Sequence, residues 1–495
     1  MNGRFGIVAQ VRASSDSPNA GAAAVAGDAA KRLLPWLVAV AFFMQALDTT
    51  ILNTAVPAIA QALNVAPLSM KAVAASYTLA LAVFIPISGW MADRFGTRRV
   101  FAAAIALFTL GSLLCGLCRN IHWLVVCRVI QGFGGAMMMP VGRLTLVRAF
   151  AKSELIRTMS FVAIPGLIGP MLGPVMGGLL IKYFHWSWIF FLNVPIGLVG
   201  LYLVRRHLPD FRAAVSHRLD VTGLILFGSG IALLSYVLEV FGEHFLSDRE
   251  IVGLLGISVA LLAGYAVNAL HTRHPLLRLG LLRKRTLFAS VGGSFVTRLG
   301  VGGIPFLFPL LYQLGLGFTP VQSGLLMMPQ AIAAISLKPV TPRILNRFGY
   351  RTVLIGNTLL LGTTILSFAS IGADTPVWLI VAQAFLFGLF SSMQYTSMNT
   401  LVYADVSNEE SSGASTIAST VQQLSISFGV AFASLITALF IPDRFTSAPA
   451  PMLHGIHEAF LVLGVMTILS TAVFGRLRSD DGAAVSQHKA VLPAG

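Results

Sequence analysis

The segment DRFGTRRV, Asp93–Val100, returns as NRFGYRTV at Asn346–Val353, and this repeat decides the fold. The two copies lie 253 residues apart and are identical at five of eight positions. Each follows an apolar stretch that crosses a membrane in the same direction, so the two copies share one orientation. A parallel repeat of this kind predicts two six-helix halves related by an axis along the membrane normal.

The composition around this repeat is that of a membrane protein. Of the 495 residues 56% are hydrophobic and 11% are charged, and the mean hydropathy is +0.80. Soluble domains carry about 25% charged residues, so a soluble enzyme, a disordered protein and a disulfide scaffold are excluded. The apolar runs are continuous and about 20 residues long, which favours helices over the alternating segments of a membrane β-barrel. We count about fourteen of them.

The charge distribution predicts the orientation. Lys and Arg number 34 against 19 Asp and Glu, giving a net charge of +15, which by itself would also suit a nucleic-acid binder. However, 25 of the 34 lie in loops on the side of the N-terminus, and 5 lie in the opposite loops. Basic loops mark the cytoplasmic side. We therefore expect an all-α integral membrane protein in the lipid bilayer, with both termini cytoplasmic and no nucleic acid as a partner.

Six helices in each half leave two helices over, at about Asp220–Tyr236 and Ile251–His271. The predicted organisation is a disordered cytoplasmic tail (residues 1–30), a six-helix bundle (31–208), a linker with two extra transmembrane helices (209–275), a second six-helix bundle (276–478) and a cytoplasmic tail (479–495).

Four motifs occur in order in the first half. They are LDTTILNTAVPAI from Leu47, GWMADRFGTRR from Gly89, RVIQGFGGAMMMPVGR from Arg128 and GPMLGPVMGG from Gly169. With them the chain resembles the major facilitator superfamily, in particular the fourteen-helix drug:proton antiporters of the EmrB/QacA type and, among these, the MdtD-like multidrug exporters. The resemblance implies the major facilitator fold and a proton-coupled exporter of small molecules that works by alternating access in a bacterial inner membrane. It also implies that the proton gradient supplies the energy and that no cofactor is needed.

Asp48 is the only acid deep in the first six apolar stretches. A carboxylate inside a membrane is costly, and it marks a functional site by default. Arg128 lies inside the fourth stretch, and because arginine stays protonated it cannot itself carry the proton. The resemblance implies that Asp48 and Arg128 couple proton movement to transport.

The resemblance implies that the repeated loop is a gating latch. In such a latch, charged residues at helix ends form different salt bridges in the two transporter states. Its residues are Gly89, Asp93, Arg94, Gly96, Arg98 and Arg99 in the first copy, and Arg347, Gly349 and Arg351 in the second. Gly96 suits a tight turn with positive φ. Since Asn346 stands where the first copy has Asp93, we expect the second copy to latch less well.

The fifth apolar stretch carries small residues at spacings of three and four, which permit close helix packing, and prolines that bend the helix. By resemblance it is the antiporter helix. These residues are Gly169, Pro170, Gly173, Pro174, Gly177 and Gly178.

Arg298 lies near mid-membrane and needs an anion, yet no nearby acid is an obvious partner and Glu239 is the remaining one. Arg143 and Lys338 lie nearer the helix ends and either line the cavity or snorkel to the interface. An alternative function is therefore export of an organic anion, or of a metal-carboxylate chelate, by intramembrane arginines. The predicted substrate-binding residues are Gln45, Asn53, Gln131, Arg143, Arg298, Gln394, Tyr395, Asn399 and Gln423.

Other function classes find less support in the sequence. It holds no phosphate loop for an ATP pump, and no HExxH motif or intramembrane Ser/His pair for a membrane-embedded enzyme. We predict no catalytic residues and no metal site. A channel remains an alternative that predicts no pH coupling. A periplasmic adaptor and an outer-membrane channel stay open as partners.

Overall fold

The computed structural model describes residues 28–65, 70–213, 217–240, 247–440 and 449–486, and these residues form helices without any strand. The first half contains α2 (Asp28–Ala62), α3 (Lys71–Phe84), α4 (Ser88–Phe95), α5 (Thr97–Leu117), α6 (Ile121–Ala149), α7 (Leu155–Tyr183), α8 (Trp188–Phe191) and α9 (Asn193–His207). Two helices follow, α10 (Val221–Val240) and α11 (Asp248–His271). The second half contains α12 (Arg285–Val301), α13 (Ile304–Pro309), α14 (Pro320–Ser336), α15 (Thr341–Ser367), α16 (Val377–Leu401), α17 (Ser411–Phe440), α18 (Pro449–Leu469), α19 (Thr471–Phe474) and α20 (Ala483–Ser486).

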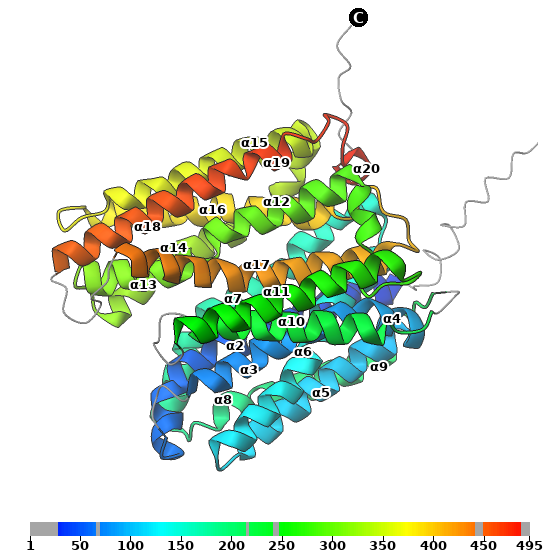
Figure 1. Ribbon diagram of the computed structural model, residues 1–495, viewed down its shortest axis with the longest axis horizontal. Helices are drawn as coiled ribbons and strands as arrows, with labels where there is room; N and C mark the ends of the chain where they lie inside the picture. Colours follow the sequence, from blue (N-terminus) through cyan, green and yellow to red (C-terminus); the bar gives the residue numbers. More distant parts are fainter. Residues whose placement is uncertain (1–27, 66–69, 214–216, 241–246, 441–448, 487–495) are drawn as a thin grey trace, which may run out of the picture.

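The helices form two bundles (Figure 1), one from α2 to α9 and the other from α12 to α19. The bundles lie against each other at one end and diverge toward the other. The inserted helices α10 and α11 pack on each other, and α10 packs on α3 of the first bundle. Their residue ranges overlap those of the two extra helices that the sequence predicts, and the division of the chain into domains stays a prediction.

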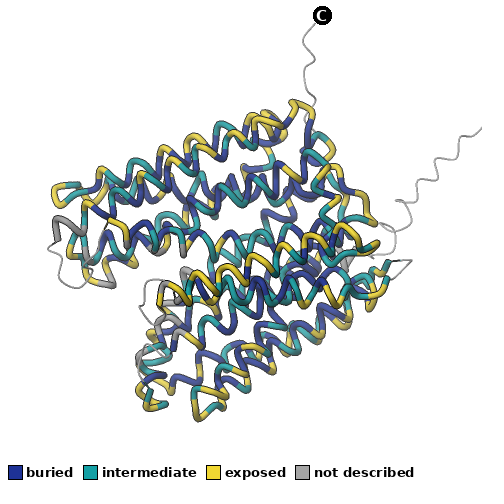
Figure 2. Tube along the Cα trace, viewed as in Figure 1, coloured by how far each residue is buried: buried dark blue, intermediate teal, exposed yellow. Residues whose placement is uncertain are grey.

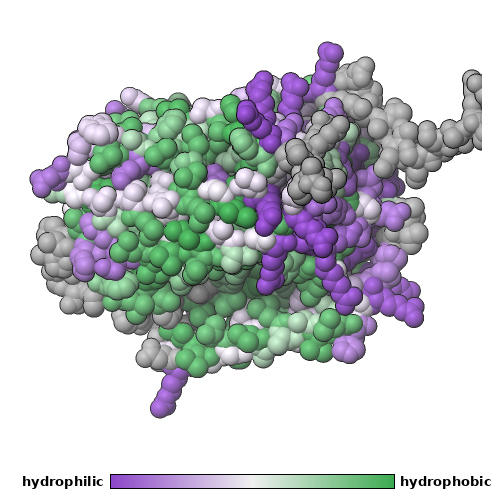
Figure 3. All heavy atoms as spheres, turned by 90° about the horizontal axis from the view of Figure 1, so that it is seen from above, coloured by the Kyte–Doolittle hydropathy of each residue, from purple (hydrophilic) through white to green (hydrophobic). Residues whose placement is uncertain are grey.

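Ten stretches of the described helices are long and apolar enough to cross a membrane. The all-helical prediction is confirmed at this level, and the total of fourteen stays a prediction. Many residues on the outward sides of the helices are exposed (Figure 2), and apolar side chains cover much of the face that Figure 3 shows. In α11, for example, Val252, Val259 and Leu270 are 67%, 56% and 78% exposed. Exposed apolar faces of this extent require a lipid environment.

Both copies of the repeated loop turn at a glycine with positive φ. Gly96 has a φ of 92° and Gly349 a φ of 73°, a region that residues with a Cβ rarely adopt. The expectation for Gly96 is confirmed. Both loops and α20 lie at the end where the bundles meet, and hydrophilic side chains gather at the same end (Figure 3). We call this the basic end.

The first part of the predicted C-terminal tail is folded. Residues 479–486 are folded at the basic end and include α20. The Asp481 carboxylate accepts hydrogen bonds from Arg285 Nε and Nη2 at 2.7 and 2.6 Å, and from the backbone N–H of Arg478 at 2.7 Å. The small, polar composition of this segment gave no indication of the ion pair between Asp481 and Arg285. Residues 1–27 and 487–495 lie outside the described part of the chain.

This ion pair predicts a pH-dependent contribution to stability. Burial of the Asp481 carboxyl opposes its ionisation, but the hydrogen bonds and charges of Arg285 and Arg478 outweigh burial and lower its pKa. A lowered carboxyl pKa stabilises the fold above the ordinary value of about 4, and the contribution is lost as pH falls through the lowered pKa. We expect Asp481→Asn to reduce the melting temperature by about 2 °C at pH 7, with the difference shrinking toward pH 3. Asp480→Asn, at the exposed neighbour, is the control; equal melting at pH 7 for both variants would contradict the assignment.

Candidate functional site

A buried polar network surrounds Asp48, midway along α2. Its Oδ2 lies 2.6 Å from Nη1 of Arg128 on α6, and the two side chains are 0% and 1% exposed. Its Oδ1 accepts hydrogen bonds from Gln131 Nε2 at 2.8 Å and from Asn193 Nδ2 at 3.2 Å. The carboxylate therefore has an ion-pair partner and two amide donors, which together offset much of the cost of burying it.

The second partner, Gln131, ties the network together. Its Oε1 accepts from Arg128 Nη1 at 2.7 Å, and its Nε2 also donates to Ser112 Oγ on α5 at 2.7 Å. The Arg128 guanidinium lies 4.4 Å from the ring centroid of Tyr77 on α3, a cation–π contact. The sequence predicts Gln131 as a substrate ligand, but the structure places it inside the network instead, where it has no exposed surface.

Asn193 and Ser112 belong to the network although the sequence did not single them out. Asn193 is the first residue of α9 and is 1% exposed. An amide in the apolar stretch WSWIFFLNVPIG was the available signal. Ser112 offers none, because serine is common in packed membrane helices.

Helix α7, which the sequence predicts as the antiporter helix, packs directly against α2 beside Asp48. A Cβ added at Gly169 would lie 2.9 Å from Ala46 Cβ and 2.9 Å from the Leu47 backbone nitrogen, and one at Gly173 would lie 3.2 Å from the Ile51 nitrogen. Only glycine permits this approach. Gly178 has nothing within 4 Å of the same position, so it contributes no such contact. The side chains of Asn53, Pro170 and Pro174 lie outside the described part of the structure.

The predicted latch bridges the two halves at the basic end. Asp93 Oδ1 lies 2.7 Å from Arg148 Nη2 at the end of α6, and its Oδ2 accepts a hydrogen bond from Ser412 Oγ at 2.5 Å, near the start of α17. A Cβ on Gly89 would meet the backbone of Ser412, with its carbonyl oxygen at 2.9 Å. The sequence predicts Asp93 and Gly89 as latch residues. It does not predict Arg148 and Ser412, because these two contact Asp93 from helices that are distant in the sequence.

The arginines of the predicted latch lie at or near the surface of the same end, whereas Gly96 and Gly349 are buried. Arg94 stacks near Trp90 and Phe95, and Arg347 near Phe348, with guanidinium-to-ring distances of 5.5 to 6.0 Å. The backbone of Arg98 donates to Asp210 at 3.2 Å, whereas Arg99 and Arg351 are exposed.

Among the described residues, every hydrogen bond between the halves lies in the part of the molecule nearer the basic end. Lys152 donates to the Ala404 carbonyl at 2.7 Å, Ser415 to the Pro140 carbonyl at 3.0 Å, and Arg143 to Gln422 Oε1 at 3.0 Å. Together with Asp93–Ser412, these contacts close the basic end.

Three buried cations lie in the interior without an acidic partner in the described part of the chain. Arg143, Arg298 and Lys338 are 8%, 5% and 4% exposed, and none forms an ion pair there. Arg298 Nε donates to Ser294 at 3.0 Å and its guanidinium lies 4.0 Å from the ring of Tyr395, while Lys338 Nζ donates to Thr396 at 2.5 Å. Arg143 and Lys338 therefore point inward, and the snorkelling alternative is wrong for both. The side chain of Glu239, the remaining acid, lies outside the described residues.

The other predicted substrate ligands divide into two groups. Gln394 is fully buried and bonds to Asn357 and Thr358 at 2.8 Å within the second half, so its amide serves the packing of α15 and α16. Gln45 is 8% exposed with an unpartnered Oε1, and Asn399 and Gln423 are half-buried.

The sequence profile of the Major Facilitator Superfamily matches residues 38–430 and 291–491. The chain belongs to this superfamily. It is 40% identical over 450 residues to MdtD of Serratia proteamaculans and 38% identical over 456 residues to MdtD of Escherichia coli. Both relatives are named as multidrug resistance proteins. The matches cover 90% and 92% of this chain and 93% and 97% of the relatives. The resemblance drawn from the four motifs is confirmed.

Two solved major facilitator structures share the fold at 14% identity. The human organic anion transporter MFSD10 aligns with a TM-score of 0.64 over 90% of this chain and 99% of its own length. The proton:xylose symporter XylE aligns with a TM-score of 0.62 over 89% and 94%. At 14% identity, both matches show similarity of fold and nothing about function. Superfamily members are transporters, and the chain is one of them.

The glycine contact between α7 and α2 predicts a position-specific effect. We expect Gly169→Val to force the two helices apart at Ala46 and Leu47, costing about 1–3 kcal/mol and disturbing the helix that carries Asp48. Thermal unfolding and transport by the purified, reconstituted protein measure the two effects. Gly178→Val, on the same helix, should match wild type in both; equal loss in the two variants would contradict the packing argument.

Proposed function

We propose that this protein is a proton-driven exporter of small molecules across a bacterial inner membrane, of the multidrug-efflux type. In this proposal fourteen helices cross the membrane and the basic end, with both termini, faces the cytoplasm. The excess of Lys and Arg in the loops of that end supports the orientation. The names of the MdtD relatives support the substrate type.

The observation that carries the proposal is the buried Asp48–Arg128 pair with its two amide donors. Asp48 is the group in this network that can gain a proton and lose its charge. When a proton binds to an Asp48 oxygen, the carboxyl stops balancing the Arg128 guanidinium. An unbalanced buried cation is strongly unfavourable, by several kcal/mol, so protonation favours a rearrangement of the helices that hold the pair.

The described conformation corresponds to one end of a transport cycle. Its basic end is closed by the contacts between α4, α6 and α17, so in the proposed orientation the central region is shut off from the cytoplasm. In the proposed cycle, Asp48 is paired with Arg128 in this state and takes up a proton from the periplasmic side. Loss of the ion pair then favours opening of the cytoplasmic end, where cargo binds and the proton leaves.

The energy of this cycle is sufficient for efflux. One proton that crosses about 150 mV releases roughly 3.5 kcal/mol, which supports a cargo gradient of several hundred-fold. The proposal needs no cofactor. Its partners are the lipid bilayer, protons and the cargo, and an adaptor to an outer-membrane channel stays an open question.

A second substrate class has an observation of its own. Arg143, Arg298 and Lys338 are buried with no acidic partner in the described residues. Buried cations are normally paired, so a cargo that carries carboxylates, free or as a metal chelate, would supply the missing charge. This favours organic-anion export as the alternative to the export of apolar drugs.

The Asp48 role predicts loss of coupling without loss of fold. We expect Asp48→Asn to reduce pH-gradient-driven uptake into everted vesicles at least tenfold, because the amide cannot change its charge. Asp374→Asn, at an exposed acid between α15 and α16, serves as the control and should transport like wild type. Normal export by Asp48→Asn at wild-type expression would rule out the proton-coupling role.

The cation cluster predicts how cargo charge matters. In everted vesicles, a panel of radiolabelled carboxylates is compared with cationic dyes. If the cargo is an anion, Arg298→Gln lowers carboxylate uptake at least tenfold, Arg298→Lys restores part of it, and Arg343→Gln, at an exposed arginine, has no effect. Unchanged carboxylate uptake by Arg298→Gln, or uptake of dyes alone by wild type, would remove this alternative.

A further inference from the structure

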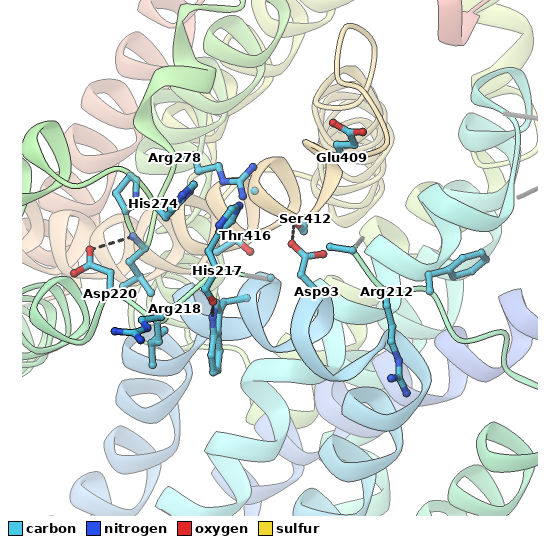
Figure 4. Close-up of a pocket in the computed structure, with 18 of the residues that line it drawn as sticks. Asp93, Arg212, His217, Arg218, Asp220, His274, Arg278, Glu409, Ser412 and Thr416 are labelled. Atoms are coloured by element: carbon cyan, nitrogen blue, oxygen red, sulfur yellow. Dashed lines mark hydrogen bonds between the residues drawn. The ribbon is translucent and has the colours of Figure 1, made fainter. Parts of the chain in front are cut away.

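The two copies of the repeated loop differ in the residue that begins each motif. In the first copy Asp93 binds Arg148 and Ser412, and the bond to Ser412 crosses to the second half (Figure 4). In the second copy the corresponding residue is Asn346, a neutral amide on α15. An amide has two N–H groups to donate, so it can bind acceptors that a carboxylate repels.

Asn346 donates to two backbone carbonyls. With its nitrogen facing them, the amide donates to the Pro342 carbonyl at 3.1 Å and to the Ser486 carbonyl. The first bond stays within α15, whereas the second goes to α20, the short helix Ala483–Ser486. An aspartate at position 346 would donate neither bond, since an ionised carboxylate only accepts. The second copy of the loop therefore has a partner of its own, the C-terminal segment.

The C-terminal segment, residues 479–486, is docked on the second half. The ion pair of Asp481 with Arg285 attaches it to the start of α12. Gly482 turns the chain with a φ of 84°, and a Cβ at this position would collide with the ring of Tyr350 on α15. Glycine thus allows the chain to pass close to this ring and then to form α20. We call residues 479–486 the docked segment.

The docked segment also contacts the first half. Helix α20 packs on α15 and, in the first half, on α7 and on the turn Lys152–Glu154 that precedes α7 (Figure 1). Val485 is 1% exposed and belongs to the same buried apolar cluster as Leu155, the first residue of α7. The turn itself crosses to the second half, because Lys152 donates to the Ala404 carbonyl at 2.7 Å. The docked segment therefore covers a contact between the halves.

The two copies of the loop thus connect the halves by different means. The first copy bonds directly to Ser412 on the opposite half, and the second copy binds α20, which packs on the opposite half. Helix α20 can contact α15 and the turn before α7 together only while the halves lie close at the basic end. Contacts that exist in one of two conformations shift the equilibrium toward that conformation.

We propose that the docked segment is a strap that holds the basic end closed, and that Asn346 is the residue that fastens it. Position 346 has to donate to the Ser486 carbonyl, which explains why an amide stands there in place of the acid of the first copy. Release of the strap is then one step in the opening of the basic end. The strap is separate from the proton network, whose groups surround Asp48.

Hydrogen–deuterium exchange of the purified full-length protein in detergent tests this role, because exchange reports local opening. Asn346→Asp removes both donated bonds and places a negative charge against two carbonyl oxygens. We expect exchange to become at least tenfold faster at residues 483–486 and also at residues 155–165 of α7, in the other half. The matched control is Asn120→Asp, where the amide oxygen accepts from the Trp123 N–H at 2.9 Å. A carboxylate accepts there equally well, so the basic end should exchange as in wild type.

A second substitution acts from the side of the segment. Gly482→Val prevents docking, because the new side chain would collide with Tyr350 and the positive φ disfavours it. We expect the same faster exchange at residues 155–165. Gly356→Val on α15 is the control, since a Cβ there has nothing within 4 Å. The melting temperature of each variant shows that the two bundles remain folded.

Two results would overturn the proposal. If Asn346→Asp leaves residues 483–486 as protected as in wild type, Asn346 does not fasten the segment. If Gly482→Val releases these residues while residues 155–165 exchange at the wild-type rate, the segment is a folded tail without influence on the halves. The experiment uses neither cargo nor a proton gradient and keeps Asp48 intact, so its failure is distinct from a failure of the proposed transport function.

Discussion

The buried ion pair of Asp48 and Arg128 is the constraint on which the rest of the first half depends. A carboxylate in the middle of a membrane helix is tolerated only when a cation and further donors surround it. Here α6 supplies Arg128 and Gln131, and α9 supplies Asn193. Gln131 also bonds to Ser112 on α5, and the ring of Tyr77 on α3 lies against the Arg128 guanidinium. One network thus fixes the relative positions of five helices. The same network contains a group whose charge changes with a single proton, so the packing of the half and its protonation state are coupled.

Helix α6 links this network to the gate. It carries Arg128 at the proton network, Arg143 near the interior cations and Arg148 at the latch. Arg128 and Arg148 are 20 residues apart, about 30 Å along a helix, so one element spans from the buried pair to the basic end. A small rotation of α6 changes both ends together. The close glycine contact of α7 with α2 fixes the position of the α2 segment that carries Asp48. In the proposed transport cycle, proton binding at Asp48 and opening of the basic end are two effects of one helix rearrangement.

The sequence identifies the residues whose burial or backbone conformation is energetically unfavourable, and it misses neutral polar residues that are common in membrane helices. Asp48 and Arg128 stand out because intramembrane charges are rare, and the two loop glycines stand out because positive φ needs them. Asn193, Ser412 and Gln422 do not, because neutral polar residues are common in packed membrane helices and their partners lie 100 or more residues away. Gln394, which the sequence predicts as a substrate ligand, forms hydrogen bonds within the second half, and its role in binding stays a prediction. The folded structure of residues 479–486 was not predicted, because their composition is small and polar.

The most direct test of the central claim is hydrogen–deuterium exchange of the basic end in the purified protein, with intrinsic rates corrected for pH. If protonation of Asp48 releases the closed state, wild type exchanges faster at α4 and at the start of α17 when the pH is lowered. Asp48→Asn, which mimics the protonated acid, exchanges fast at every pH. Identical, pH-responsive exchange in wild type and Asp48→Asn would contradict the account, because some other group would then control the gate.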